Sequence, residues 1–298
     1  MGELAVVVQL LGGLGNQMFQ YAAGRALADR WGCSLKLDLT HFDQDPQRTY
    51  NLDGLNIRAE IATTDELRSV NRLSYNSVIS KLLSLYPRKG RNVKRYRLFK
   101  ERKFVFDETL IDQRPPVYLA GYWQSERYFS DFAAAIRRDF SINFNLDSEA
   151  RRHLESIKNT SSISLHVRRG DYVTNPIAAR YHGVCSLDYY LTAANYIAAQ
   201  VSEPHFFVFS DDIKWVTDNL RLPYVTTFVN FDNKKHCPIV DMQLMKVCKH
   251  HVIANSSFSW WGAWLNPSQH KVVVAPKKWF NHASADTKDL LPYSWVCL

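Results

Sequence analysis

Two adjacent arginines, Arg168 and Arg169, follow an apolar run typical of a buried strand, in the segment HVRRGDY. A guanidinium at the end of a buried strand is costly unless an anion or a carboxylate pairs with it. Its planar fork of donors suits a diphosphate. Side chains alternate along a strand, so His166 and Arg168 share one face and Arg169 points to the other. The segment therefore predicts either an anion site built on Arg168 and braced by Arg169, or a structural ion pair with Asp171.

A glycine-rich turn, GGLGNQMFQ from Gly12 to Gln20, follows the first apolar run of the chain. Glycines let a ligand approach the backbone closely, and the start of the next helix offers free N–H groups to an anion. Asn16 and Gln17 are the polar side chains beside this turn. The alternative is a tight turn in which Asn16 only caps the helix.

Two more polar segments follow predicted strands. Asp211 and Asp212 either cap a helix or receive the N–H groups of a guanine or the hydroxyls of a ribose. A segment of small polar residues at a helix start favours anions; it consists of Asn255, Ser256, Ser257 and Phe258. The three tryptophans that follow are more typical of a core than of a platform for sugar rings.

Strand-like and helix-like segments alternate along the chain, which predicts doubly wound parallel sheets. In the first half we expect strands at 5–11, 34–40 and 117–120 and helices at 16–31 and 63–86. In the second half we expect strands at 163–167, 205–209, 224–229, 251–254 and 271–275, with helices at 187–201, 213–220, 239–249 and 258–265. The ligands of such sheets bind beyond the carboxyl ends of the strands, where the polar segments lie.

The predicted domains are 1–150 and 151–298, bridged by a polar helix near 145–160, and the C-terminal tail is able to pack back on the first domain. An uncharged stretch at 4–24 is interrupted by Gln and Asn and by four glycines, so it predicts a strand, a turn and a helix rather than a membrane span.

The composition, with 46% hydrophobic and 22% charged residues among 298, is that of a globular protein and excludes a disordered chain. The net charge is +8, and the segment Arg88–Lys103 alone carries nine Lys or Arg against one Glu. Such a basic segment suits a membrane, a nucleic acid or a phosphorylated ligand, or is simply solvated. Its Tyr96, Leu98 and Phe99 would let part of it lie on lipid. Five scattered cysteines without a CxxC pair predict buried thiols and a reducing compartment.

Rival motifs are incomplete. Gly13 and Gly15 with Asp38 suggest an NAD- or SAM-dependent enzyme, but Met18 stands where the third glycine of the dinucleotide fingerprint belongs. A nucleic-acid-binding protein is the other alternative, and it depends on the basic segment alone. An Asp-x-Asp at Asp43 and Asp45 lies in a polar loop, so no metal site is predicted.

Taken together and in order, GGLGNQMFQYA, GYWQSERYF, HVRRGDYV, FSDD and IANSSFSWWGAWLN resemble the α1,2-fucosyltransferases of glycosyltransferase family 11. The resemblance implies a GT-B-like fold, in which two Rossmann-like α/β domains face a cleft. The N-terminal domain would take the acceptor and the C-terminal domain the donor. It also implies inverting transfer of L-fucose from GDP-β-L-fucose to the 2-hydroxyl of a terminal β-galactoside, without a metal or another cofactor.

The resemblance also implies roles for single residues. His166 would lie near the guanine, Arg168 on the β-phosphate, and an acidic residue at Asp211 or Asp212 on the guanine or ribose. Catalysis would rest on Arg168 and on Asp171, which either takes the proton or only orients an arginine. The other expected substrate-binding residues are Asn16, Gln17, Arg169, Asn255, Ser256, Ser257 and Phe258. We expect a bacterial-type cytoplasmic enzyme, held on the inner membrane face by peripheral contact.

Overall fold

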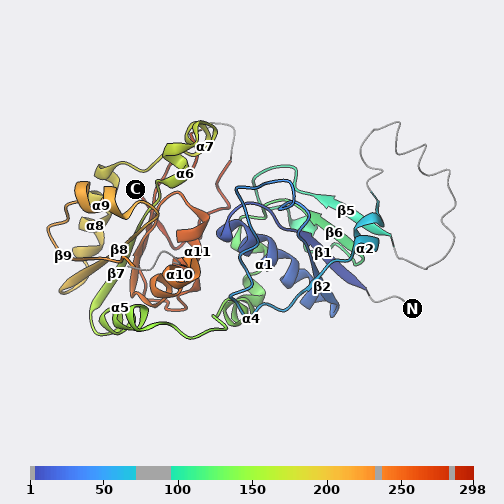
Figure 1. Cartoon of the computed structure of the whole chain (residues 1–298), viewed down its shortest axis with the longest axis horizontal. Helices are drawn as coiled ribbons and strands as arrows, with labels where there is room; N and C mark the ends of the chain where they lie inside the picture. Colours follow the sequence, from blue (N-terminus) through green and yellow to red (C-terminus); the bar gives the residue numbers. More distant parts are fainter. Residues whose placement is uncertain (1–3, 72–94, 232–236, 282–285) are drawn as a thin grey trace. The chain divides into compact units, whose positions relative to one another are not determined.

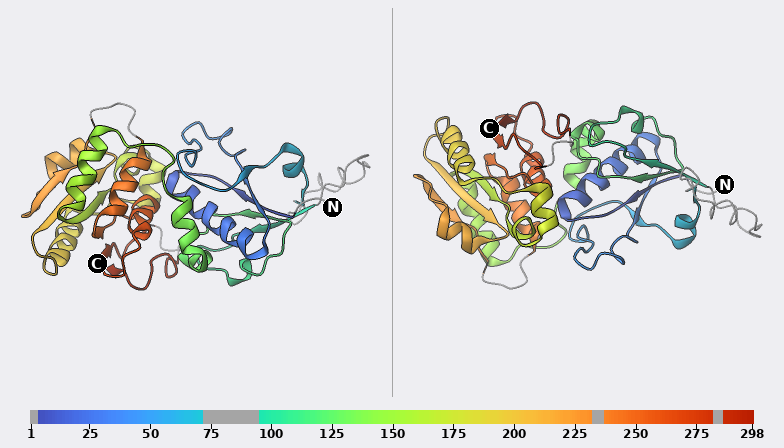
Figure 2. Two further views of the ribbon diagram at one scale, coloured as in Figure 1. Left: turned by 90° about the horizontal axis from the view of Figure 1, so that it is seen from below. Right: turned by 90° about the horizontal axis from the view of Figure 1, so that it is seen from above.

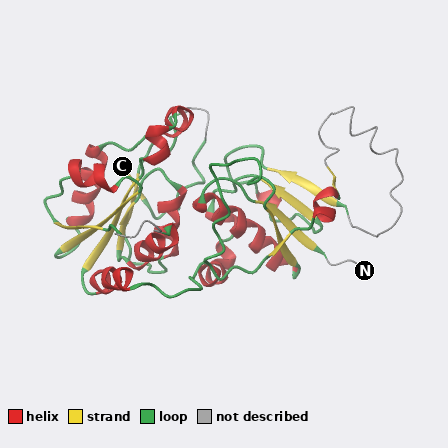
Figure 3. Cartoon of the chain, viewed as in Figure 1, coloured by secondary structure: helices red, strands yellow, loops and turns green. Residues whose placement is uncertain are grey.

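The computed structural model describes residues 4–71, 95–231, 237–281 and 286–298, and the chain divides into two compact units, Met1–Phe140 and Ser141–Leu298 (Figure 1). Each unit holds a parallel sheet with helices beside it (Figure 3). The predicted pair of doubly wound α/β domains, as expected for a GT-B-like chain, is therefore confirmed. The division falls after Phe140, whereas the predicted boundary follows residue 150.

The N-terminal unit has the strand order β3-β2-β1-β6-β5-β4 among its described residues, and every pair is parallel. The strands are β1 (Ala5–Gln9), β2 (Ser34–Asp38), β3 (Glu60–Ile61), β4 (Val70–Asn71), β5 (Tyr96–Lys100) and β6 (Val117–Ala120). The helices are α1 (Leu14–Trp31), α2 (Thr64–Arg68) and α4 (Ala133–Asp139), with short 3-10 turns at Glu108–Leu110, Glu126–Tyr128 and Ser130–Phe132.

The apolar run of β1 is buried on both faces, as the sequence predicts. One face of β1 packs on α1, where Gly24 comes so close to Val8 and Leu35 that a larger residue would force these side chains to shift. Ala5 and Val7 point to the opposite face and join a second apolar cluster with Tyr96 and Tyr118. The α1 helix ends at Gly32, whose φ of 58° is the left-handed conformation that glycine adopts freely.

Two expectations for the N-terminal unit are wrong where the structure describes them. The helix expected over 63–86 ends at Arg68, and the chain turns into β4 at Val70; the rest of that helix lies outside the described residues. Residues 88–94 of the basic segment also lie outside them. Its Tyr96 is buried in the sheet, Leu98 packs on the same cluster, and Phe99 stacks on Trp123, so these side chains are turned to the core and not to lipid.

The C-terminal unit has the strand order β12-β11-β10-β7-β8-β9 among its described residues, again with all pairs parallel. The strands are β7 (Ser161–Val167), β8 (Pro204–Ser210), β9 (Val225–Phe228), β10 (His250–Val252), β11 (Val273–Ala275) and β12 (Val296–Cys297). Read from β9, the order is 3-2-1-4-5-6, which is the Rossmann order. The order reverses between β7 and β10, so this point of the carboxyl edge is where a ligand is expected.

Helices cover both faces of this sheet (Figure 2). They are α5 (Ser148–Lys158), α6 (Gly170–Thr174), α7 (Pro176–His182), α8 (Leu187–Ala198), α9 (Ile213–Asn219), α10 (Pro238–Val247) and α11 (Ser257–Leu265). Phe206 and Val208 of β8 face α8 and α9, while Phe207 and Phe209 face α5 and α10. This alternation is the reason that β8 reads as an unbroken apolar run.

Buried polar groups and the chain end also hold this unit together. His251 of β10 is buried, with Nδ1 2.8 Å from Oγ of Ser164 and Nε2 3.0 Å from Nδ2 of Asn266. Burial first, and then Lys271 and His250, hold the pKa of His251 well below its ordinary value. The described tail residues join this sheet through β12, and the backbone of Leu298 exchanges hydrogen bonds with Ala275 and Lys277.

The helix α5, expected to bridge the domains, belongs to this unit and packs through Leu154 and Ile157. All five cysteines are free, and Cys248 is buried whereas Cys297 is exposed. In the described part of the chain, no helix combines the length and the apolar character that crossing a bilayer requires.

Candidate functional site

Two arginines and two aspartates meet at the carboxyl edge of the C-terminal sheet because of strand register. β7 and β8 pair in parallel along their whole lengths, and their last residues stand opposite each other. The chain then continues with Arg168 and Arg169 after β7 and with Asp211 and Asp212 after β8. Neighbouring strands lie about 4.8 Å apart, so the two pairs fall within reach of each other.

Arg168 is held between two carboxylates. Its Nη2 donates to Oδ1 of Asp171 at 2.6 Å, and its Nη1 lies 2.9 Å from Oδ2 of Asp211. The guanidinium also lies over the ring of Tyr172, 5.2 Å from its centroid. Burial alone would lower the pKa of Arg168, but Asp211 and Asp171 outweigh it and the pKa is raised. Arg168 is therefore a fixed cation, and the predicted ion pair with Asp171 is present.

Unused donors remain on Arg168. A guanidinium has five N–H groups, and the two ion pairs occupy one on each terminal nitrogen. The Nε atom is buried and has no hydrogen-bond partner in the part of the chain that the structure describes. The two arginines and three carboxylates of the cluster carry a formal charge of −1. An anion at this edge must therefore take the free N–H groups of Arg168 and compete with Asp171 and Asp211.

Arg169 points away from Arg168, as alternation predicts, and braces the edge. Its Nε donates to Oδ2 of Asp212 at 3.3 Å, and its guanidinium lies 3.5 Å from the centroid of the Trp215 ring. Its backbone N–H donates to Oδ1 of Asp211 at 2.8 Å. The next residue is Gly170, where a Cβ would collide with the carboxylate of Asp211. The glycine of HVRRGD is thus required by the close approach of that carboxylate.

Asp211 and Asp212 have different partners. Asp212 caps α9, because its Oδ1 accepts from the backbone N–H of Trp215 at 3.2 Å, and it also pairs with Arg169. Oδ2 of Asp211 forms an ion pair with Arg168, and Oδ1 accepts a hydrogen bond from the backbone N–H of Arg169. Of the two alternatives for the aspartates, the structure shows the cap at Asp212 and ion pairs at both residues.

His166 is buried on β7, two residues before Arg168. Its ring lies 5.3 Å from the ring of Phe258, which belongs to α11 beyond β10. This contact spans the point where the strand order reverses. Burial first, and then Arg168, lower the pKa of His166 to about 3, so the imidazole is neutral at physiological pH. Its Nδ1 has no hydrogen-bond partner among the described residues.

The segment after β10 is mostly engaged with the protein itself. Nδ2 of Asn255 donates to the carbonyls of His182, Gly183 and Trp279 at 3.1 to 3.2 Å, so Asn255 clamps two loops together. Ser256 caps α11 by accepting from the backbone N–H of Phe258. Ser257 begins α11. Trp260, Trp261 and Trp264 are buried and pack on one another, as expected for a core.

Asn16 and Gln17 lie in the N-terminal unit, at the carboxyl end of β1. Gln17 is buried; it donates to the carbonyls of Gly12 and Thr49 and accepts from the backbone N–H of Asn51. Gln17 thus connects the loop at residues 49–51 to the glycine turn. Asn16 is not the helix cap, because α1 begins at Leu14 and Gly13 occupies the cap position. Its Oδ1 accepts from Nε2 of Gln124.

The carboxylate of Asp38, the ribose-binding candidate of the dinucleotide alternative, is also engaged internally. It is buried, with Oδ2 accepting from the hydroxyl of Tyr118 at 2.5 Å and Oδ1 from the backbone N–H of Thr40 at 2.9 Å. A dinucleotide would need this carboxylate for its ribose. The N-terminal unit therefore lacks the key contact of that alternative.

Glu101 is a feature of the N-terminal unit that sequence reasoning missed. It follows β5, and its carboxylate accepts from the backbone N–H groups of Tyr122 and Trp123 at 2.7 and 3.1 Å. Trp123 is buried and has a φ of 55°, a conformation that few bulky residues adopt. Burial raises the pKa of Glu101. The signal in the sequence was GYWQSERYF, whose Gly121 leaves room for the side chain of Glu101.

Among the described residues, no group of three or more His, Cys, Asp and Glu side chains is arranged to hold a metal ion. Asp45 of the Asp-x-Asp segment lies 3.8 Å from Nε2 of His41. That transfer proceeds without a metal stays a prediction.

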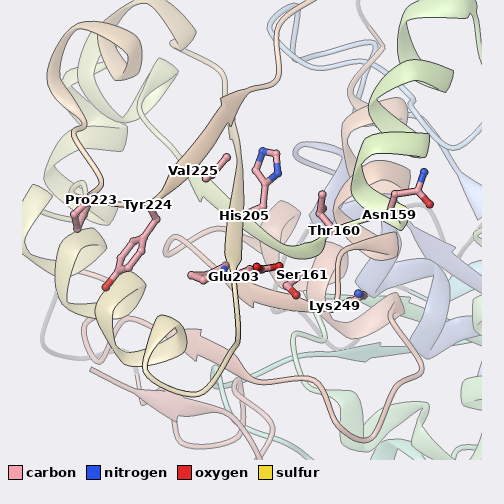
Figure 4. Close-up of a pocket in the computed structure, with 10 residues that line it drawn as sticks. Asn159, Thr160, Ser161, Glu203, His205, Pro223, Tyr224, Val225 and Lys249 are labelled. Carbon is pink, nitrogen blue, oxygen red and sulfur yellow. The ribbon is translucent and has the colours of Figure 1, made fainter.

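Figure 4 shows residues that line a cavity of about 680 Å³. This cavity lies at the amino edge of the C-terminal sheet, opposite to the edge that carries the arginines. Its lining includes Ser161, His205 and Val225, which stand at the beginnings of β7, β8 and β9, and Lys249 just before β10. Ligands of doubly wound sheets bind at the other, carboxyl edge. We therefore place the candidate site at Arg168 and His166 and not in this cavity.

Comparison with known proteins identifies the family of this chain. The model of glycosyl transferase family 11 matches residues 73–298. The chain is 36% identical to an alpha-1,2-colitosyltransferase of Escherichia coli over 297 residues, 98% of each chain. It is also 36% identical to the Escherichia coli O-antigen biosynthesis glycosyltransferase WbnK, covering 97% of this chain and 99% of that one.

A galactoside alpha-(1,2)-fucosyltransferase 1 of Rattus norvegicus is 26% identical over 262 residues, which are 85% of this chain and 61% of that protein. The alternatives of an NAD- or SAM-dependent enzyme and of a nucleic-acid-binding protein are set aside by these matches. The chain belongs to glycosyl transferase family 11, and its activity is that of a glycosyltransferase.

Proposed function

We propose that this enzyme transfers L-fucose from GDP-β-L-fucose to the 2-hydroxyl of a terminal β-galactoside, with inversion at the sugar carbon. The observation that carries the proposal is Arg168 at the carboxyl end of β7, in a chain of family 11: it is a cation held by two carboxylates, and its Nε–H has no partner among the described residues. Among the relatives, the Rattus norvegicus protein is named for fucose transfer to position 2 of galactosides.

In this proposal the donor binds along the carboxyl edge between β7 and β10. The diphosphate takes the free N–H groups of Arg168, and neutral His166 with Phe258 lies on the nucleotide side. Because Arg168 is already fixed by Asp171 and Asp211, little reorganisation is needed when charge develops on the leaving phosphate. The acceptor is assigned to the N-terminal unit, whose carboxyl edge carries Asn16.

The proposed step is an in-line displacement. The galactose 2-oxygen forms a bond to C1 of fucose while the C1–O bond to the β-phosphate breaks, and the bonding electrons leave with GDP. The transition state resembles an oxocarbenium ion, as in inverting glycosidases. Arg168 neutralises the charge that grows on the phosphate, so no metal is needed in this scheme.

The hydroxyl proton goes either to Asp171 or to an oxygen of the departing phosphate. Asp171 accepts from Nη2 of Arg168 through Oδ1, and as the base it would take the proton on its carboxylate while Arg168 stays in place. In the alternative, Asp171 only orients Arg168. The variant Asp171→Asn separates the two: a normal turnover rate in a folded variant excludes the role as a base.

A second donor is favoured by one observation, the 36% identity to a colitosyltransferase over 98% of each chain. Colitose is L-fucose without the 3-hydroxyl group. A site that hydrogen-bonds this hydroxyl rejects the deoxy sugar strongly, whereas a site that leaves it in an apolar pocket discriminates weakly. The ratio of kcat/KM for GDP-fucose and GDP-colitose therefore identifies the donor.

The test is GDP release from GDP-fucose and GDP-colitose with lactose, N-acetyllactosamine and lacto-N-biose, followed by linkage analysis of each product by NMR. We expect an α1,2 linkage to galactose and rates that are unchanged by EDTA. A different linkage, or GDP release with no sugar transfer, would contradict the proposal. Loss of activity in EDTA that is restored by a divalent cation would contradict the metal-free scheme.

A further inference from the structure

An exposed apolar surface lies directly after the candidate site, on α6, α7 and the loop that follows. Ile177 is 82% exposed, Val173 49%, and Tyr181 and Val184 each 43%. These four residues stand within twelve positions of the chain. We name them, together with the cations described below, the α6–α7 surface. Isolated exposed apolar residues are ordinary, whereas several within one short segment indicate a site of interaction.

The backbone of this segment is tied down, so the side chains are presented outwards by a fixed support. Asn175 caps α7 by accepting from the backbone N–H groups of Ile177 and Ala178, and Pro176 occupies the first turn. Ile177 and Tyr181 are four residues apart, on one face of α7. Asn281 donates from its backbone to the carbonyl of Tyr181 at 2.8 Å. The clamp made by Asn255 fixes the end of α7 in the same way.

Exposed cations accompany the apolar residues. Arg180 lies on α7, and Lys277 and Lys278 lie in the segment that Asn255 and Asn281 join to α7. Residues 172–187 and 276–281 contain no Asp or Glu. Asp171 of α6 is an acidic neighbour, but its carboxylate is paired with Arg168. Exposed aliphatic side chains and a tyrosine among Lys and Arg are typical of surfaces that lie in the headgroup region of an anionic bilayer.

We propose that the α6–α7 surface binds this enzyme to an anionic lipid bilayer. The apolar side chains enter the headgroup region, and Arg180, Lys277 and Lys278 face the lipid phosphates. α6 begins at Gly170, two residues after Arg168, so the same contact brings the transferase edge to the bilayer. In the basic segment of the N-terminal unit, the described Tyr96, Leu98 and Phe99 pack inside and do not supply the apolar part.

The test is co-sedimentation with phosphatidylcholine vesicles that contain about one third phosphatidylglycerol, against pure phosphatidylcholine. The test variants are Ile177→Asp and the double change Lys277→Glu with Lys278→Glu. Matched controls are Val225→Asp and Lys249→Glu, which alter an exposed apolar residue and an exposed lysine at the opposite edge of the same sheet. Circular dichroism and thermal unfolding establish that each variant is folded.

We expect the unaltered enzyme to bind the anionic vesicles and not the neutral ones. Each cation near an anionic surface contributes roughly fivefold, so the double lysine variant should bind about 25-fold more weakly or worse. Ile177→Asp should weaken binding about tenfold or more, because it removes an apolar side chain that would be buried in the headgroup region of the bilayer. Both controls should bind normally, and all four variants should keep their activity on a water-soluble acceptor.

Four results would overturn the proposal: no vesicle binding by the unaltered enzyme, equal binding to neutral vesicles, normal binding by the two test variants, or equal loss in the controls. A change in oligomeric state of the test variants would assign this surface to a second copy of the chain. Loss of activity on a soluble acceptor would assign it to the sugar site. Vesicle binding needs no substrate, so it is judged independently of the proposed reaction.

Discussion

Replacing Arg168 by alanine tests the proposed mechanism most directly. The change removes the guanidinium that lies 2.6 Å from Asp171 and 2.9 Å from Asp211, together with an Nε–H that has no partner in the described part of the chain. A cation about 4 Å from a diphosphate charge contributes roughly 4 kcal/mol at an effective dielectric constant of about 20. Loss of one such donor to a developing anion typically costs ~3–4 kcal/mol, and we expect turnover to fall about 10²–10³-fold.

The same change also affects stability, because it leaves two carboxylates without their cation. For a fully buried pair this costs about 3–5 kcal/mol. The side chains of Asp171 and Asp211 are each 25% exposed, and water screens part of the charge, so we expect a loss of roughly 1–3 kcal/mol in the free energy of unfolding. Denaturant unfolding must therefore accompany the kinetic assay, and turnover is compared only at a temperature where the variant is folded.

Two companion variants sharpen the result. Arg168→Lys keeps the charge but loses the planar fork, so its turnover should lie between those of the enzyme and of Arg168→Ala. Arg169→Ala removes a neighbouring guanidinium that contacts Asp212 and Trp215, so it should lower stability more than turnover. GDP affinity is measured by calorimetry and GDP release by a coupled assay. A folded Arg168→Ala variant with ordinary turnover and ordinary GDP affinity would refute the assignment of the phosphate to Arg168.

Three further changes have definite outcomes. Gly170→Ala forces a Cβ against the carboxylate of Asp211 and should cost about 1–3 kcal/mol in urea unfolding, with loss of GDP binding; an unaltered unfolding midpoint would disprove the close approach. His166 and His251 are neutral when folded, because their pKa values are lowered from about 6.5 in the unfolded chain, to about 3 for His166. The histidine contribution to the free energy of unfolding should be complete above about pH 6.5. As the pH decreases from there, the free energy of unfolding should decrease by up to ~1.4 kcal/mol per pH unit for each histidine. His251→Asn should reduce this slope, and an identical slope would contradict the reasoning. Gln17→Ala removes three hydrogen bonds to the backbone and should lower the free energy of unfolding by about 1–3 kcal/mol, with GDP affinity unchanged. Weakened GDP binding without loss of stability would show instead that Gln17 contacts the ligand.

Most of the sheet architecture could be predicted, because a buried parallel strand leaves a continuous apolar run. The strand expected at 117–120 is β6 itself, and the other predicted strands agree with the observed ones to within a few residues. The two-residue strands β3, β4 and β12 could not be predicted, since two residues carry no periodicity. The helix expected over 63–86 shows the opposite error: apolar residues at helical spacing continue past Arg68, but Val70 is needed in the sheet.

The site was partly predictable for a different reason. Parallel register alone brings the residues after β7 beside those after β8, so the meeting of the arginine and aspartate pairs follows from the strand assignment. The partners of Asn255 and Gln17 did not follow. A buried amide that clamps loops and an amide that binds a sugar use the same donors and acceptors, and only the positions of distant loops such as residues 49–51 and 279 decide between them.

The pairing of the last residues has a practical consequence for how this enzyme is handled. Leu298 donates to the carbonyl of Ala275 and accepts from the backbone N–H of Lys277, so its backbone is fixed beside β11. An affinity tag or fluorescent protein attached after Leu298 would begin beside Lys277. It would therefore obstruct the α6–α7 surface, to which Lys277 belongs. Such labels belong elsewhere on the chain if adsorption to vesicles or enzymatic rates are to reflect the enzyme alone.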